Sequence, residues 1–187
     1  MGGNDWAVKA YTEGAVFVAF DLETTGLDPR LDKIVEIGAV KFDRRGLIAG
    51  FSTLINPGIP MPPDASRVNN ITDEMLLGKP PLDDVFPDFL HFISGTILAA
   101  HNAAFDCGFI NEKLKKGQAS PFPSLPNRVI DTLSFSREKF LGLGHYSLQK
   151  LAAELGISAR DAHRAEDDAR LCMGILCRCL GFDISTG

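Results

Sequence analysis

A short apolar run that ends in two acidic residues constrains this chain more than any other feature. Residues 15–20 (AVFVAF) contain no polar side chain, and Asp21 and Glu23 follow directly, ahead of the turn residue Gly26. A short apolar run that stops at a turn is typical of a central strand buried on both faces. Because residues i and i+2 of a strand point to the same face, the sequence predicts two neighbouring carboxylates at the end of a buried strand.

A buried strand that carries two carboxylates needs a physical reason. Burying an unpaired carboxylate costs several kcal/mol, whereas two carboxylates facing one way offer hard oxygen ligands to a divalent cation. The Asp-x-Glu spacing alone is weak evidence, because the chain has 24 acidic residues and a pair exposed to solvent is the alternative. Thr24, Thr25 and Leu27 follow at once, in a turn rich in backbone donors and hydroxyl groups, which favours a binding site.

The rest of the chain predicts one α/β domain around that strand. Its 187 residues, 45% of them apolar and 23% charged, fit a single globular domain. Further strands are predicted at residues 34–42, 47–55, 97–100 and 129–131, and helices at residues 85–93, 104–115, 132–140, 147–155 and 164–180. Three strands joined by short turns, then alternating strands and helices, predict a mixed five-stranded sheet, antiparallel and then parallel, with helices packed on it.

Composition predicts the boundaries of the domain and the location of the protein. We expect residues 1–13 to form an N-terminal arm, residues 14–182 the domain, residues 183–187 a short C-terminal tail, and the proline-containing residues 117–126 a loose loop. The longest apolar run has six residues, against about twenty for a membrane helix, and the N-terminus does not resemble a signal peptide. The four cysteines include no Cys-x-x-Cys pair and are interpreted as reduced thiols. A cytoplasmic protein without a membrane partner is expected.

A second motif begins where the predicted strand at residues 97–100 ends. It contains His101, Asn102, Phe105 and Asp106, and the acid lies near the start of the following helix. A helix acid that is stabilised by the macrodipole is the alternative to a metal ligand. Phe105 either belongs to the core or provides a surface on which a base stacks.

A third motif contains His163 and Asp168. These residues are five apart, which on a helix places them about 140° off a common face, so they reach one site only if His163 precedes the helix. Asp168 lies three residues before Leu171 and falls on the apolar stripe of that helix, whereas Asp167 is offset by about 100°. The alternative is a surface cap followed by a charged helix face.

The three motifs, DLETTG at residues 21–26, HNAAFD at 101–106 and HRAEDDA at 163–169, resemble the DEDD exonucleases of the His-containing subclass. The similarity is greatest to the proofreading 3′–5′ exonuclease subunit or domain of bacterial DNA polymerase III, and it covers nearly the whole chain. It implies a ribonuclease-H-like fold. It also implies removal of nucleotides from a 3′ end, with nucleoside 5′-monophosphates as products.

The resemblance also implies roles for individual residues. Asp21, Glu23, Asp106 and Asp168 match the family's metal-binding acids, with Asp21 bridging two ions, and His163 matches its general base. The implied cofactors are two Mg²⁺ or Mn²⁺ ions, because carboxylate oxygens suit these cations. The reference pKa of histidine, about 6.5, suits removal of a proton from the attacking water near neutral pH.

Val68 and Asn69 match the segment of the family that contacts the terminal nucleotide. The polymerase III subunit often has a histidine where Asn69 stands, which leaves the handling of the substrate end open. The other expected substrate contacts are Thr24, Thr25, Leu27, His101, Asn102 and Phe105.

The acidic balance of the chain limits how it holds a nucleic acid. Its formal net charge of −5 predicts no broad basic surface. The expected partners are single-stranded DNA 3′ ends and a DNA polymerase catalytic subunit. One alternative is a relative that trims RNA ends, which needs contacts to the 2′-hydroxyl. Another is a non-catalytic module on the same fold, which would lack at least one of the five catalytic side chains.

Overall fold

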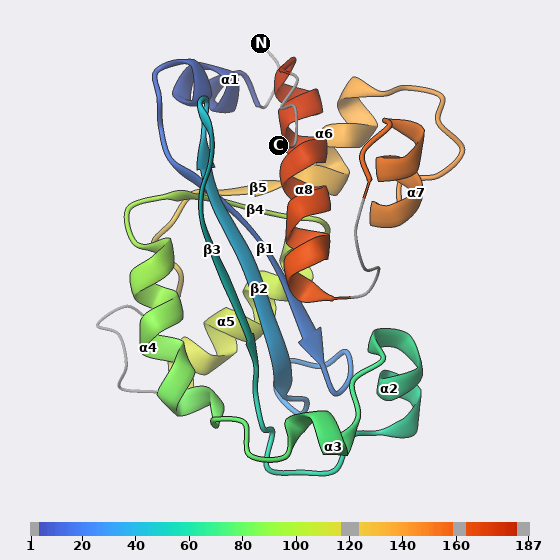
Figure 1. The fold of residues 1–187 in the computed structure, drawn as a ribbon. Helices are drawn as coiled ribbons and strands as arrows, with labels where there is room; N and C mark the ends of the chain where they lie inside the picture. Colours follow the sequence, from blue (N-terminus) through green and yellow to red (C-terminus); the bar gives the residue numbers. More distant parts are fainter. Residues whose placement is uncertain (1–3, 117–123, 159–163, 183–187) are drawn as a thin grey trace.

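The apolar run lies in the middle strand of a five-stranded sheet. The computed structural model describes residues 4–116, 124–158 and 164–182, and its strand order is β3-β2-β1-β4-β5 (Figure 1). The strands are β1 (Phe17–Thr24), β2 (Ile34–Asp43), β3 (Gly46–Leu54), β4 (Ile97–Ala100) and β5 (Val129–Asp131). Because β2 pairs antiparallel with β1 and β3 while β4 pairs parallel with β1 and β5, the predicted mixed sheet is confirmed.

The helices predicted from sequence all occur, with ends that shift by a few residues. They are α4 (Leu82–Ile93), α5 (Ala103–Lys116), α6 (Thr132–Lys139), α7 (Leu148–Glu154) and α8 (Ala165–Leu180). Three further helices were not predicted: α1 (Asp5–Thr12), α2 (Pro63–Asn69) and α3 (Asp73–Leu76). The expected arm therefore contains a helix, and α1 packs Ala7 and Tyr11 into the core.

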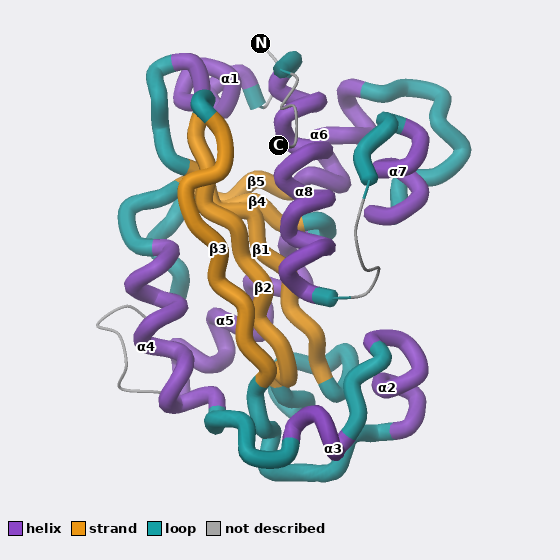
Figure 2. The backbone as a smooth tube through the Cα atoms, viewed as in Figure 1, coloured by secondary structure: helices purple, strands orange, loops and turns teal. Residues whose placement is uncertain are grey.

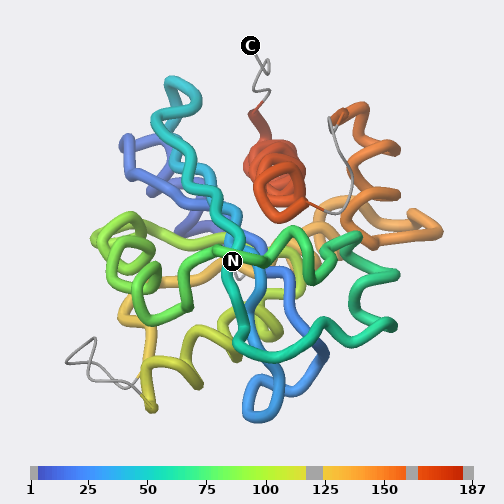
Figure 3. Tube along the Cα trace, turned by 60° about the horizontal axis from the view of Figure 1, so that its bottom comes forward, coloured from blue at the N-terminus to red at the C-terminus, as the bar shows by residue number. Residues whose placement is uncertain are grey.

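Alternate residues of β1 face opposite layers of helices. Phe17 and Ala19 pack with residues of α8, whereas Val18 and Phe20 pack with residues of α4 and α5. In Figures 1 and 3, α8 covers one face of the sheet and α5 the other. The two acids of β1 continue the face of Phe17 and Ala19 and so point toward α8. The α2–α3 segment lies at the end of the sheet where β1 terminates (Figure 2).

The structure also bears on the expected cysteines, loop and membrane segments. All four cysteines are free thiols; Cys172, Cys177 and Cys179 are buried as predicted, whereas Cys107 is only half-buried. Most of the expected loose loop, residues 117–123, lies outside the described residues, as does the expected tail at 183–187. Among the helices that the structure describes, none is both long enough and apolar enough to cross a membrane.

Candidate active site

Three carboxylates meet on the α8 face of β1. Asp21 and Glu23 extend from β1, and Asp168 extends from the first turn of α8. One oxygen atom from each residue lies within 4.8 Å of the other two. Asp168 is buried whereas Asp167 is only half-buried, so the orientation inferred from the apolar stripe agrees with the structure.

Burial and mutual repulsion make it costly to ionise these three carboxylates without a counter-charge. Desolvation, followed by the charges of Asp106 and Glu23, raises the pKa of Asp21 well above its usual value. Desolvation, followed by the charge of Asp168, raises the pKa of Glu23 to about 8. Carboxylates that are this costly to ionise hold a proton or bind a cation. Because every donor in the group is a carboxylate oxygen, it fits a hard divalent ion such as Mg²⁺ or Mn²⁺.

The fourth predicted acid, Asp106, lies beside this group. It belongs to the first turn of α5 and is 2% exposed, and its Oδ1 accepts a hydrogen bond from the backbone N–H of Leu22 at 3.2 Å. Desolvation raises the pKa of Asp106 to about 8. Its charge is also the largest electrostatic contribution to the raised pKa of Asp21, so the two motifs share one electrostatic environment. Its role as a metal ligand stays a prediction.

The N-terminus of α8 is fixed on β2 by an ion pair that sequence reasoning missed. Arg164 Nη2 lies 2.6 Å from Glu36 Oε1, and the backbone N–H of Ala165 donates to Glu36 Oε2 at 3.2 Å. A Cβ atom on Gly38 would lie 2.0 Å from the carbonyl carbon of Ala165, so only glycine lets the helix approach this closely. The signal in the sequence was an acid in the middle of an apolar strand.

The predicted general base, His163, lies outside the described residues. The helix α8 begins at Ala165, so position 163 precedes it, as convergence of His163 with Asp168 requires. A contact to Asp168 does come from another element, the amide of Gln149 in α7, at 3.1 Å from each carboxylate oxygen. Gln149 was not among the predicted site residues. The role of His163 in proton transfer stays a prediction.

Three predicted substrate residues build the turn that follows β1. Asn69 is 2% exposed, and its Nδ2 donates to the backbone carbonyl of Thr24 at 3.3 Å. The hydroxyl of Thr24 donates to the carbonyl of Gly26 at 2.6 Å, and Thr25 is buried. These contacts join the end of α2 to the end of β1. The side chains of Asn69 and Thr24 thus hydrogen-bond to the protein's own backbone. Contact of these residues with a substrate stays a prediction.

Leu27 and Val68 are two large apolar side chains that are exposed on the segments next to the end of β1. Leu27 is 83% exposed in the loop after β1, and Val68 is 66% exposed on α2. Exposed apolar groups are free to contact a nucleotide base. Their contact with a terminal base stays a prediction.

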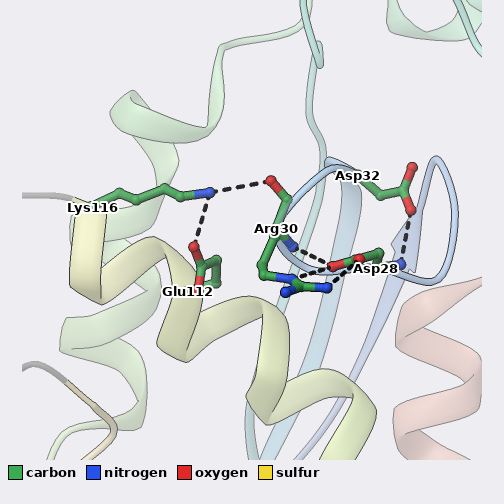
Figure 4. A network of polar contacts seen from close by, with 5 residues as sticks. All are labelled: Asp28, Arg30, Asp32, Glu112 and Lys116. Atoms are coloured by element: carbon green, nitrogen blue, oxygen red, sulfur yellow. Dashed lines mark hydrogen bonds and ion pairs between the residues drawn. The ribbon is translucent and has the colours of Figure 1, made fainter.

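A polar network stabilises the loop that carries Leu27 (Figure 4). Arg30 donates from Nη2 to Asp28 Oδ2 at 2.9 Å, and the backbone N–H of Asp28 donates to Asp32 Oδ2 at 2.8 Å. Lys116, in the last turn of α5, donates to the carbonyl of Arg30 at 3.3 Å. The loop therefore has a defined conformation that is anchored to α5.

The expected substrate residues of the second motif differ in their surroundings. Both ring nitrogens of His101 are engaged, Nε2 with the carbonyl of Tyr146 at 2.7 Å and Nδ1 with the hydroxyl of Thr132 at 3.0 Å. Burial lowers the pKa of His101, which favours the neutral ring. Asn102 is exposed, and Phe105 packs against the α4 and α5 core. The side chain of Asn102 is thus the accessible one of the three.

Comparisons with known proteins agree with this geometry. Residues 18–176 match the RNase_T family model, which describes exonucleases. The chain is 51% identical over 171 residues to the DNA polymerase III subunit epsilon of Treponema pallidum, covering 90% of this chain and 78% of that protein. It is 41% identical to the PolC-type DNA polymerase III of Clostridium perfringens, covering 86% of this chain but 11% of that protein.

Solved structures share the fold. Exonuclease X in complex with 5′-overhanging duplex DNA superposes with a TM-score of 0.71 and 26% identity, covering 88% of this chain and 91% of that one. Exonuclease I superposes with a TM-score of 0.70 and 20% identity, covering 89% of this chain and 42% of that one. The chain therefore belongs to the RNase_T family of exonucleases, and it is the 3′–5′ exonuclease that its three acidic motifs predicted.

Proposed function

We propose that this exonuclease removes nucleotides from the 3′ end of single-stranded DNA during proofreading or repair and releases nucleoside 5′-monophosphates. The observation that carries the proposal is the group formed by Asp21, Glu23 and Asp168, whose oxygens lie within 4.8 Å of one another. The similarity to polymerase III subunits supports DNA as the substrate. Residues 14–182 form the catalytic domain in this proposal.

Two divalent ions, Mg²⁺ or Mn²⁺, fit the oxygen donors of Asp21, Glu23 and Asp168, with Asp106 beside them. Such ions neutralise the carboxylates and stabilise charge on the oxygens of the scissile phosphate. His163 accepts the proton of the attacking water on its imidazole. The N-terminus of α8 keeps Asp168 in reach of β1 while this happens.

The other contacts of the strand follow from the exposed residues of the site. Leu27 and Val68 contact the terminal base, and Asn69 holds α2 in place behind them. With a formal net charge of −5, the enzyme binds its strand weakly and works best beside a polymerase catalytic subunit, in the cytoplasm. The relatives named as polymerase III subunits support that partnership.

The test is digestion of a 5′-labelled single-stranded oligodeoxynucleotide by the full chain in Mg²⁺ or Mn²⁺. We expect a ladder of shortened strands and nucleoside 5′-monophosphates, abolished by excess chelator or by Asp21→Asn. Asp88→Asn, an exposed acid of α4, is the control and should act like the wild type. His163→Ala should lower turnover by about 10²–10⁴-fold.

Two outcomes would contradict the proposal. Full activity of Asp21→Asn, or full activity of the wild type in excess chelator, would show that hydrolysis does not depend on a metal ion held by these acids. Faster digestion of the matched RNA oligonucleotide than of the DNA would assign the chain to RNA trimming instead.

A further inference from the structure

The amide of Gln149 lies against the carboxylate of Asp168. Its Nε2 is 3.1 Å from Oδ1 and 3.1 Å from Oδ2. The Gln149 side chain thus presents its NH₂ group to Asp168, whose carboxylate oxygens accept. Asp168 is 4% exposed and Gln149 is half-buried, and a hydrogen bond to a charged group in such a place is stronger than one in water.

The backbone that carries Gln149 is itself held in place. Leu148 and Leu151 of α7 are buried in the same cluster as the apolar residues of α8. The segment before α7 is tied to the second motif, because Nε2 of His101 lies 2.7 Å from the carbonyl oxygen of Tyr146. The amide therefore reaches Asp168 from an anchored helix rather than from a mobile loop.

The acids on β1 give such a donor a role. One oxygen of Asp168 lies within 4.8 Å of Asp21 and of Glu23, and like charges at this distance repel. When these carboxylates ionise ahead of cation binding, repulsion favours rotation of Asp168 away from β1. A donor that contacts both oxygens opposes that rotation, since the carboxylate must leave the amide in order to turn.

We propose that Gln149 is a positioning residue that holds the carboxylate of Asp168 toward β1 before the cation binds. The inference rests on the proposed function, because it assigns Asp168 to a metal site. Groups that hydrogen-bond to metal ligands orient them, and their loss typically costs about 10–100-fold in metal affinity or activity. Gln149 thus sets the affinity of the site without touching substrate.

The experiment compares the full-length wild type with Gln149→Met and Gln149→Asn. Methionine keeps the length of the side chain and removes the donor, while asparagine keeps the amide but withdraws it from Asp168. The matched control is Glu154→Gln, an exposed position on the same helix. Mn²⁺ binding is measured by titration calorimetry without DNA, thermal unfolding is measured in excess chelator, and hydrolysis of a single-stranded oligodeoxynucleotide is measured at saturating Mn²⁺.

We expect both Gln149 variants to bind Mn²⁺ about 10–100-fold more weakly than the control. At saturating Mn²⁺, where the cation itself holds Asp168, we expect a kcat and a KM for the oligonucleotide close to those of the wild type, and we expect unfolding in chelator like that of the wild type. Wild-type Mn²⁺ affinity in both variants would overturn the inference, and so would loss of folded protein in chelator, which would make Gln149 a structural residue. A wild type that binds Mn²⁺ but hydrolyses no DNA would refute the proposed function while leaving the comparison of affinities valid.

Discussion

Arg164, at the N-terminal boundary of α8, forms an ion pair with Glu36 near the start of β2, with 2.6 Å between Nη2 and Oε1. Glu36 is 1% exposed and lies directly opposite Glu23 in the β1–β2 register. The pair therefore attaches α8 beside the acids of β1 and sets where Asp168 can reach. It also affects electrostatics, because the charge of Glu36 raises the pKa of Glu23 and the charge of Arg164 lowers it.

We expect Arg164→Met to destabilise the fold and slow hydrolysis. The substitution leaves Glu36 buried without its cation, and breaking a buried ion pair costs about 3–5 kcal/mol. We expect about 3 kcal/mol, the low end of this range, because the Arg164 side chain is 41% exposed. Urea unfolding in excess chelator measures the change. The double variant Glu36→Gln, Arg164→Met removes the stranded charge and should recover part of the stability. A double variant no more stable than Arg164→Met would contradict this account.

Gly38→Ala should misplace the start of α8. The added Cβ would lie 2.0 Å from the carbonyl carbon of Ala165 and 2.1 Å from the backbone nitrogen of Glu166, so helix or strand must shift. A shift of about 1 Å at catalytic groups can cost about 10²-fold in rate, and we expect a loss of that order in kcat.

Gly50→Ala is the matched control for Gly38→Ala. It adds the same methyl group to the neighbouring strand β3, where the nearest atom is the flexible Oε1 of Glu166 at 3.4 Å. Equal activities of the two alanine variants would show that the close approach at Gly38 does not matter for catalysis.

The sheet could be predicted because its strands are local patterns. The strand β4 at Ile97–Ala100 and the strand β5 at Val129–Asp131 have the predicted bounds, since each is a short segment with apolar residues that directly precedes a predicted motif or helix. The helices α2 and α3, with 7 and 4 residues, are too short to show a helical period and depend on tertiary packing. The helix α1 was missed because it also depends on tertiary contacts. In one of them the guanidinium group of Arg128 lies over the ring of Trp6, 3.4 Å from the ring centroid.

The acids of the site could be predicted because they form motifs, whereas the residues that hold them could not. The pairing of Glu36 with Arg164 depends on which strands are neighbours and on where α8 lies. A single sequence does not show how far the start of α8 lies from β2. The contact of Gln149 with Asp168 has the same origin. The motif around His101 indicated its importance, but the structure was needed to show that both ring nitrogens bind protein atoms.

Asn69→Ala should weaken the attachment of α2 to the end of β1. The buried carbonyl of Thr24 and the backbone N–H of Ile71 would each lose the Asn69 side chain as partner, at a cost of about 1–3 kcal/mol for a group left unsatisfied. Because Val68 is presented by the same helix, KM for the oligonucleotide should rise more than kcat falls. Asp64→Asn, exposed on α2, is the control. An unchanged KM with unchanged stability would remove Asn69 from this role.

The metal-free enzyme should become less stable as the pH rises from about 5 to 8. The pKa of Glu23 is raised from 4.5 to about 8 in the fold, and that of Asp106 from 3.8 to about 8. Between these values the folded protein retains protons that the unfolded chain has released, so its free energy of unfolding falls with increasing pH. The stabilisation from these protons is complete when the pH lies below the pKa values of the two groups in the unfolded chain. It is lost as the pH rises past their pKa values in the folded protein.

Thermal unfolding in excess chelator across this range, compared with Glu23→Gln, measures the effect. Glutamine cannot ionise, so the variant should lose less stability between pH 5 and 8 and should exceed the wild type at pH 8. Mn²⁺ should raise the melting temperature of the wild type most at pH 8, because the cation then binds carboxylates that no longer hold protons. A metal-free wild type whose stability rises with pH relative to Glu23→Gln would contradict the raised pKa of Glu23.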